Sequence, residues 1–277
     1  MKLKLPAARA VFTVMAVMVL VSSLLFTACT KRESGGLTIK QGVLMIGMDI
    51  DYPPMEYVGS DGVTPMGFDV DLGKAIAERL GLTPEFIDTA WDGIFASVET
   101  QRFDIIMSSV TITDARLATH NFSNPYVGNA MAIVTRKDSA FKPRSPQQLQ
   151  GLGVSFQAET TAKFFMERLE EGGLTYTILA YDTVTRCFDE LQLGRVDVIV
   201  TDGVVAGDYA APADSVFEIT WVGEPDEFFG IVIAKGNDAL TDAINGALED
   251  LFNNGTMRRI SMEHLGADFV SPAREQW

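Results

Sequence analysis

Residues 95–109 and residues 188–202 are variants of one short sequence, and this internal repeat limits the folds that are open to the chain. In both copies a Phe, an Arg and an Asp fall in register, and each copy reads as a helix end, a turn and a buried strand. Each strand ends in a polar pair, which ends with Ser109 in the first copy and with Asp202 in the second. The repeat favours two similar α/β lobes; chance similarity between two ordinary helix–strand units is the alternative.

The ends of the two repeated strands indicate where a ligand would bind. In open α/β sheets, ligands bind beyond the carboxyl ends of the strands. Two lobes that are built alike therefore present two sets of strand ends that can face each other. We expect Ser109 and Asp202 to contact one ligand from opposite walls.

The N-terminal segment has the composition of an export signal. An apolar run over residues 11–26 contains no charge and is nearer to signal-peptide length than to that of a spanning helix. It ends in Phe-Thr-Ala-Cys, which resembles a bacterial lipobox, in which the chain is cut before the cysteine and the cysteine is lipidated. We expect a signal peptide over residues 1–28, a lipid anchor at Cys29 and a flexible tether over residues 29–36. An uncleaved anchor helix is the alternative. The basic residues before the apolar run are Lys2, Lys4 and Arg9.

Charge and cysteine content exclude several classes of function. The chain carries 37 acidic and 22 basic residues, a net charge of −15, which argues against nucleic acid and anionic lipid headgroups as partners. If Cys29 is lipidated, Cys187 is left alone and reads as a buried core thiol, without a disulfide. His120 and His264 are the two histidines, and neither forms a recognisable pattern with a cysteine. We therefore expect no metal site, no cofactor and no cysteine nucleophile.

Apolar runs alternate with amphipathic stretches, which indicates an α/β protein with mostly parallel sheets. Extended segments near residues 126–135 and 227–234 suggest a chain that crosses into a second lobe and returns. We predict a discontinuous lobe 1 over residues 37–127 plus 231–277, and a lobe 2 over residues 128–230. The predicted strands are 43–48, 104–107, 152–156 and 196–200, and the predicted helices include 68–80, 160–171 and 240–252, with Asp92 and Asp182 as caps of two further helices.

From about residue 43 to residue 266, the chain resembles the extracytoplasmic solute-binding proteins of polar amino-acid ABC transporters (bacterial solute-binding protein family 3). Each motif alone is weak, but their order and spacing are specific. The resemblance implies a two-lobed, periplasmic-binding-protein-like fold (type II), in which the lobes close on a ligand about a two-strand hinge. The segments that carry it are Asp49-Ile-Asp-Tyr-Pro-Pro-Met-Glu56, Gly67-Phe-Asp-Val-Asp-Leu72, Ser108-Ser-Val-Thr-Ile-Thr-Asp-Ala-Arg116, Phe122-Ser-Asn-Pro-Tyr126, Gln157-Ala-Glu-Thr-Thr161, Asp202-Gly-Val and Phe229-Gly-Ile.

The same resemblance implies a function in transport. The protein would be a lipid-anchored receptor in the cell envelope, outside the cytoplasm, and on the periplasmic side if the cell has two membranes. It would capture a free amino acid and deliver it to an ABC transporter permease, and we expect it to act as a monomer without enzymatic activity. One alternative is an enzyme, because the fold resembles that of cyclohexadienyl or arogenate dehydratases, and Glu159 or Asp49 would then be the candidate acid. The other alternative is a sensory receptor domain.

The resemblance assigns Arg116 to the ligand's α-carboxylate. The planar guanidinium can donate two parallel hydrogen bonds, and an unpaired charge in a dry site costs several kcal/mol. Thr160 and Thr161 begin a helix whose free N–H groups suit the same carboxylate. Family members often have Gly where this chain has Glu159. The Glu159 side chain is therefore expected either to point outward or to select a cationic group of the ligand. A surface arginine and plain helix capping are the alternatives.

The remaining candidates would bind the α-ammonium group and the side chain of the ligand. Asp202 matches the family's ammonium-binding acid and is expected to act with Ser109 and Thr111; a helix N-cap is the alternative for Asp202. Tyr52 and Trp91 match positions where the family places aromatic rings around the ligand side chain. Two residues at the far end of the ligand, Asp49 and the weaker candidate Gln157, favour a basic or amide side chain.

Overall fold

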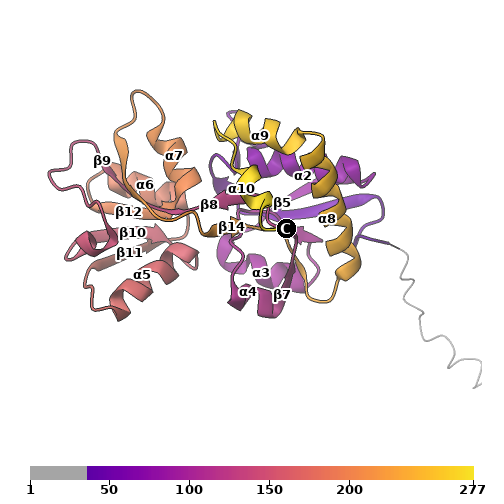
Figure 1. Cartoon of the computed structure of the whole chain (residues 1–277), viewed down its shortest axis with the longest axis horizontal. Coiled ribbons are helices and arrows are strands. Elements are labelled where there is room, and N and C mark those ends of the chain that lie inside the picture. Colours follow the sequence, from indigo (N-terminus) through magenta and orange to yellow (C-terminus); the bar gives the residue numbers. More distant parts are fainter. Residues whose placement is uncertain (1–35) are drawn as a thin grey trace, which may run out of the picture. The chain divides into compact units, whose positions relative to one another are not determined.

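The computed structural model describes residues 36–277, and the residues from Leu37 on form one compact unit. Its elements gather around two five-stranded sheets and a two-stranded sheet that lies between them (Figure 1). No helix in this part of the chain has the length and apolar character needed to cross a membrane. The predicted signal peptide, Cys29 and most of the tether lie outside the described residues.

The first sheet has the strand order β5-β1-β6-β15-β7, with parallel pairing from β5 to β6 and antiparallel pairing of β15 with both neighbours. Four of its five strands therefore run in one direction. The strands are β1 (Val43–Met48), β5 (Thr83–Asp88), β6 (Ile105–Ile106), β7 (His120–Phe122) and β15 (Val232–Ala234). Its helices are α2 (Phe68–Arg79), α3 (Trp91–Glu99), α4 (Asp114–Thr119), α8 (Asp238–Asn253), α9 (Thr256–His264) and α10 (Val270–Arg274).

The second sheet repeats this topology, with the order β11-β10-β12-β9-β13 and the antiparallel strand β9 in the place of β15. The α/β class and the two lobes are thereby confirmed, and both five-stranded sheets are mixed, with two parallel and two antiparallel pairings each. The strands are β9 (Met131–Arg136), β10 (Gly153–Gln157), β11 (Thr177–Tyr181), β12 (Val198–Asp202) and β13 (Phe217–Val222). Its helices are η1 (Pro146–Leu149), α5 (Thr161–Glu171), α6 (Val184–Gln192) and α7 (Gly203–Ala210).

The sequence repeat has a structural basis in the turn between helix and strand. After α3, Asp104 accepts hydrogen bonds from the backbone N–H groups of Ile39 and Met45, and Met45 lies in β1. After α6, Asp197 accepts one from the backbone N–H of Gly153, which begins β10. Each repeated aspartate thus ties the turn to the neighbouring strand. The repeat reflects two equivalent lobes rather than a chance similarity.

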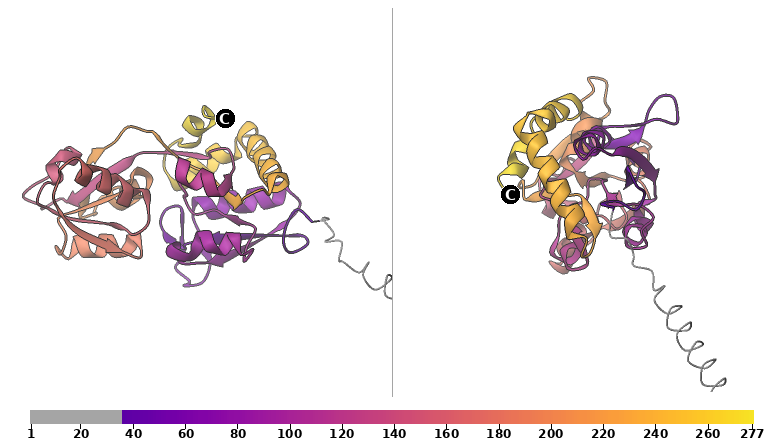
Figure 2. Two further views of the ribbon diagram at one scale, coloured as in Figure 1. Left: turned by 90° about the horizontal axis from the view of Figure 1, so that it is seen from below. Right: turned by 90° about the vertical axis from the view of Figure 1, so that its right-hand side faces the viewer.

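Two short strands connect the lobes. β8 (Val127–Asn129) pairs antiparallel with β14 (Glu227–Phe229), and both lie between the two sheets in Figure 1. The predicted lobe boundaries at 127/128 and 230/231 fall within β8 and just after β14. The chain then returns to the first sheet through β15, and α8 and α9 pack on α2, so the C-terminal helices lie beside N-terminal elements (Figure 2).

Apolar side chains fill both faces of each sheet. On β12, Val198 and Val200 face the α5 side, whereas Ile199 packs in the cluster that contains Cys187 and Phe188 of α6. A strand that is covered on both faces needs a continuous apolar run, and this is why the predicted strands are recognisable in the sequence. A small antiparallel sheet beside the first lobe contains β2 (Asp51–Tyr52), β3 (Glu56–Val58) and β4 (Pro65–Met66).

Two predicted helix caps are wrong. α3 begins at Trp91 after Ala90, so Asp92 lies inside the first turn, where its charge suits the helix dipole. α6 is capped by Thr183, whose hydroxyl oxygen accepts a hydrogen bond from the backbone N–H of Arg186 at 3.3 Å. Asp182 therefore lies one residue before the cap.

Candidate functional site

One cavity collects every predicted ligand-binding residue. Its lining comes from both lobes, as expected for a ligand held between two sets of strand ends. Glu56 and Ser108 also line it, and these two were not predicted. The predicted residues in the lining are Asp49, Tyr52, Trp91, Ser109, Thr111, Arg116, Gln157, Thr160, Thr161 and Asp202.

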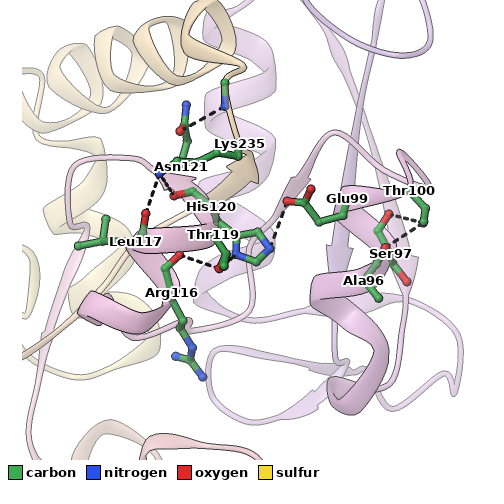
Figure 3. Close-up of polar contacts among 11 residues, drawn as sticks. Ala96, Ser97, Glu99, Thr100, Arg116, Leu117, Thr119, His120, Asn121 and Lys235 are labelled. Carbon is green, nitrogen blue, oxygen red and sulfur yellow. Dashed lines mark hydrogen bonds and ion pairs between the residues drawn. The ribbon is translucent and has the colours of Figure 1, made fainter.

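Arg116 lies on the short helix α4, which is fixed at both ends. The Thr113 hydroxyl oxygen accepts the backbone N–H of Arg116 at 3.3 Å and so caps the N-terminus. The Lys235 ammonium donates to the carbonyl oxygens of Leu117 and His120, at 2.7 and 3.2 Å, near the C-terminus. Figure 3 shows the Arg116 guanidinium pointing away from these contacts. The helix therefore presents Arg116 from a rigid base.

The guanidinium of Arg116 is held in place by a carbonyl and two rings. It donates to the Thr111 carbonyl at 2.8 Å and lies 5.5 Å from the ring centre of Trp91 and 5.1 Å from that of Phe95. Burial lowers its pKa to about 10, and the nearby carboxylates of Asp202 and Glu227 oppose this shift. The group stays charged at neutral pH and is suited to bind an anion.

Asp202 occupies the N-cap position of α7, yet its side chain makes no capping hydrogen bond. Instead the Asn129 amide donates to Oδ1 at 2.7 Å, and the Tyr52 hydroxyl, from the other lobe, donates to Oδ2 at 2.5 Å. Burial raises the pKa of Asp202 to about 6, while these hydrogen bonds and the charge of Arg116 lower it. The carboxylate faces the cavity rather than the helix, which removes the capping alternative.

Asp49 forms a second contact across the cavity. Its backbone N–H donates to the Ser108 hydroxyl at 3.0 Å, and its Oδ2 accepts from the Gln157 amide of the other lobe at 3.0 Å. Burial raises the pKa of Asp49 to about 6, and the hydrogen bond from Gln157 lowers it. Asp51 and Asp88 raise it further. This part of the cavity is acidic and favours a hydrogen-bond donor or a cation.

The loop before α5 forms part of the cavity wall. Glu159 has a left-handed backbone (φ 58°), and its side chain is exposed, so the carboxylate points to solvent. Its carbonyl accepts the Trp91 indole N–H at 3.1 Å, a further contact between the lobes. The Thr160 hydroxyl donates to the Gln157 carbonyl at 2.7 Å and makes no helix cap. The first N–H groups of α5 therefore remain as donors beside Thr161.

Four residues at or beside the cavity were not predicted from the sequence. Glu56 and Ser108 lay inside quoted motifs but had no distinct signal there. Asn129 and Glu227 lie opposite each other on the connecting strands β8 and β14, and the Asn129 amide donates to Glu227 at 3.0 Å. Burial and the charge of Asp202 raise the pKa of Glu227 to about 7. A lone polar residue in each apolar extended segment was the signal that could have found them.

The other candidates for reactivity lie elsewhere. Cys187 is buried in the core, and burial raises the pKa of its thiol to about 12, so it is a core residue. His120 contacts Glu99 at 3.3 Å (Figure 3), and His264 contacts Asp71 at 2.9 Å. No cluster suited to a metal ion occurs among residues 36–277.

Comparison with known proteins agrees with this architecture. Residues 44–267 match the model of the bacterial extracellular solute-binding proteins, family 3, and the chain belongs to this family. L-cystine-binding protein TcyJ of Escherichia coli (strain K12) is 28% identical over 229 residues, which cover 83% of this chain and 85% of that protein. The matched relatives are binding proteins rather than enzymes, in agreement with the expectation of no catalytic activity.

Solved structures share the two-lobed fold. An ancestral arginine-binding protein, solved bound to arginine and also bound to glutamine, is 32% identical to this chain with a TM-score of 0.76. The arginine-bound structure covers 81% of this chain and 98% of that one. Holo ArgBP from T. maritima is 34% identical, with a TM-score of 0.71 and coverage of 76% and 91%.

Proposed function

We propose that the protein binds a free amino acid with a basic or amide side chain and delivers it to an ABC transporter permease. The observation that carries this proposal is the pairing of Arg116 and Asp202 in one cavity. A zwitterionic ligand needs an anion-binding group and a cation-binding group that are close together, and these two influence each other's pKa. The relatives named above bind cystine or arginine, which supports an amino acid as the ligand.

The charges of the cavity favour a cationic ligand side chain. Of the three carboxyl groups in the lining, Glu56 is fully buried and its pKa is raised well above the usual range. Asp49 and Asp202 are thus the two carboxylates that stand against the single guanidinium of Arg116. An amino acid with a basic side chain carries one net positive charge and would balance this excess. The main influences on the pKa of Asp49 are burial, the hydrogen bond from Gln157 and neighbouring carboxylates, whereas the charge of Arg116 acts on Asp202. We assign Asp49 and Gln157 to the ligand side chain, and Tyr52 and Trp91 to its flanks.

Equilibrium competition tests this assignment. Arginine, lysine, histidine or glutamine should displace a bound reporter amino acid at lower concentration than glutamate or leucine. Coulomb repulsion from Asp49 disfavours glutamate, and leucine leaves buried polar groups without partners. A preference for glutamate or leucine contradicts the assignment of Asp49.

We further propose that Cys29 carries a lipid that holds the protein at the outer face of a membrane, near its permease. The lipobox-like sequence before Cys29 supports this. A Cys29→Ser substitution should move the protein from the membrane fraction to the soluble fraction and abolish incorporation of labelled fatty acid. Unchanged labelling contradicts the anchor, without bearing on amino-acid binding.

A further inference from the structure

Two buried carboxyl groups adjoin the cavity, and one of them, Glu56, is part of its lining. Glu56 of β3 and Asp69 of α2 are both 0% exposed, and each carboxyl group shifts the pKa of the other. The backbone N–H of Asp69 donates to the carbonyl of Met55, the residue before Glu56, at 2.8 Å, which places the two residues side by side. Among the described residues, no N–H or O–H donor reaches Oε2 of Glu56 or Oδ1 of Asp69. Each carboxyl group thus has one buried oxygen without a donor, and the neighbouring carboxyl group can supply that donor only if one of the two is protonated. Two carboxylates cannot hydrogen-bond to each other, because neither has a proton to donate.

The other contacts decide which group carries the proton. Oδ2 of Asp69 accepts from the backbone N–H of Ser109 at 2.9 Å and from the Tyr126 hydroxyl at 2.9 Å. Oε1 of Glu56 accepts only from the Ser108 hydroxyl, at 2.6 Å, in this part of the chain. Hydrogen bonds to a carboxylate favour its charged form. Asp69 is therefore the anion, and Glu56 is the acid.

Electrostatics agree with this assignment. Burial raises the pKa of both groups, and the charge of Asp69 raises the pKa of Glu56 further. The titratable groups that face the pair are Asp49, which also raises the pKa of Glu56, and the hydroxyls of Tyr52 and Tyr126. None of these three supplies a positive charge that would stabilise a second anion.

We propose that Glu56 and Asp69 share one proton, donated by Glu56, and that this pair is a positioning element for the Ser108–Ser109 turn of the ligand site. The Ser108 hydroxyl donates to Glu56 and accepts from the backbone N–H of Asp49, so it links the pair to the cavity. Ser109 has a left-handed backbone (φ 50°), which a non-glycine residue holds only with support, and its N–H is bound by Asp69. The role in ligand binding rests on the proposed function, whereas the shared proton does not.

Infrared difference spectroscopy of the full chain tests the shared proton without any ligand. Wild type near neutral pH should show the carbonyl stretch of a buried protonated carboxylic acid. Transfer to heavy water should shift this band only by the amount that exchange of the carboxyl hydrogen for deuterium produces. The wild-type spectrum minus that of Glu56→Gln should contain this band, and the subtraction removes any contribution from Glu227, whose pKa is also raised. The wild-type spectrum minus that of Glu78→Gln, a control at an exposed position of α2, should not contain it. Absence of the band from the first difference spectrum overturns the proposal.

The pH dependence of the free energy of unfolding gives a second readout, which a purely structural role of Glu56 would leave unchanged. A carboxyl whose pKa is raised by folding contributes stability that is complete below its unfolded pKa and is lost as the pH rises through its folded pKa. The free energy of unfolding of wild type should therefore fall as the pH rises and Glu56, the second carboxyl of the pair, ionises. In Glu56→Gln this contribution to the slope of the free energy of unfolding against pH should be absent. The same slope in both proteins contradicts the proposal.

Ligand binding then separates the two claims. Glu56→Gln keeps a donor toward Asp69 and an acceptor for Ser108, so it should weaken binding less than Asp69→Asn does. Asp69→Asn removes the anion that holds Ser109 and should weaken binding by about tenfold or more. Equal losses in both variants contradict the positioning role. If no amino acid binds wild type while the acid band is present, the proposed function fails and the shared proton stands.

Discussion

Replacement of Arg116 by lysine tests whether the guanidinium fork, rather than its charge alone, binds the ligand carboxylate. Lysine keeps the positive charge, but its ammonium cannot donate two parallel hydrogen bonds in one plane. The Thr111 carbonyl and the rings of Trp91 and Phe95 fix the plane of the guanidinium, so the arginine is already oriented for such a pair of bonds. The substitution should therefore remove about one charge-assisted hydrogen bond.

The magnitude follows from the strength of that bond. A hydrogen bond to a charged group contributes about 1.5–3 kcal/mol. Since about 1.4 kcal/mol corresponds to a factor of ten in affinity, Arg116→Lys should weaken binding by about 10- to 150-fold. Arg116→Ala leaves the carboxylate without a cation, which costs about 3–5 kcal/mol, and should abolish measurable binding.

Calorimetric titration measures both variants, and thermal unfolding shows that they are folded. Arg102→Lys is the matched control, because Arg102 lies on the same lobe at an exposed position away from the cavity. Its affinity should equal that of wild type. If Arg116→Lys binds as well as this control, or if Arg116→Ala binds nearly normally, the carboxylate is held elsewhere and the site is wrongly assigned.

Three further predictions concern Asp202, Gly67 and Asp49. Asp202→Asn replaces the charge that pairs with the α-ammonium and should cost about 2 kcal/mol or more, a loss of about 30-fold in affinity by titration; an unchanged affinity would show that Asp202 is not a ligand contact. Gly67→Ala should lower the melting temperature strongly, because Gly67 has φ 121° and an added Cβ would lie 2.3 Å from the Met55 carbonyl oxygen. Gly93→Ala, in open space on α3, should be neutral or stabilising, and a similar fall in both would refute the steric argument. Asp49 gains a proton as the pH falls through about 6, so the affinity for arginine should drop more than the affinity for glutamine. Titrations with both amino acids across this pH range measure the two affinities. A constant ratio of the two affinities would mean that Asp49 does not contact the ligand side chain.

Much of the fold could be predicted because the two lobes repeat one local pattern. Gln101 and Gly194 occupy equivalent positions in the two copies, and both have a left-handed backbone that turns the chain from helix to strand. Continuous apolar runs marked the strands covered on both faces, such as Val43–Met48. Polar residues at the ends of such strands, Ser109 and Asp202 among them, line one cavity in the structure.

The partners of these residues depend on tertiary pairing, which a single sequence does not display. Asn129 meets Glu227 because β8 pairs with β14, and the two are far apart along the chain. Glu56 reaches Asp69 only because β3 lies beside α2. The helix caps failed for a more local reason, since Thr183 follows Asp182 directly and either residue type can cap a helix.

The measurement that tests the central claim most directly is calorimetric titration of the full chain against all the common amino acids. The protein should first be unfolded and refolded to remove any ligand that it carries. We expect one tight binder per chain, with a basic or amide side chain, and no turnover of the bound ligand. A correctly folded sample that binds no amino acid, or that prefers glutamate or leucine, would contradict the account.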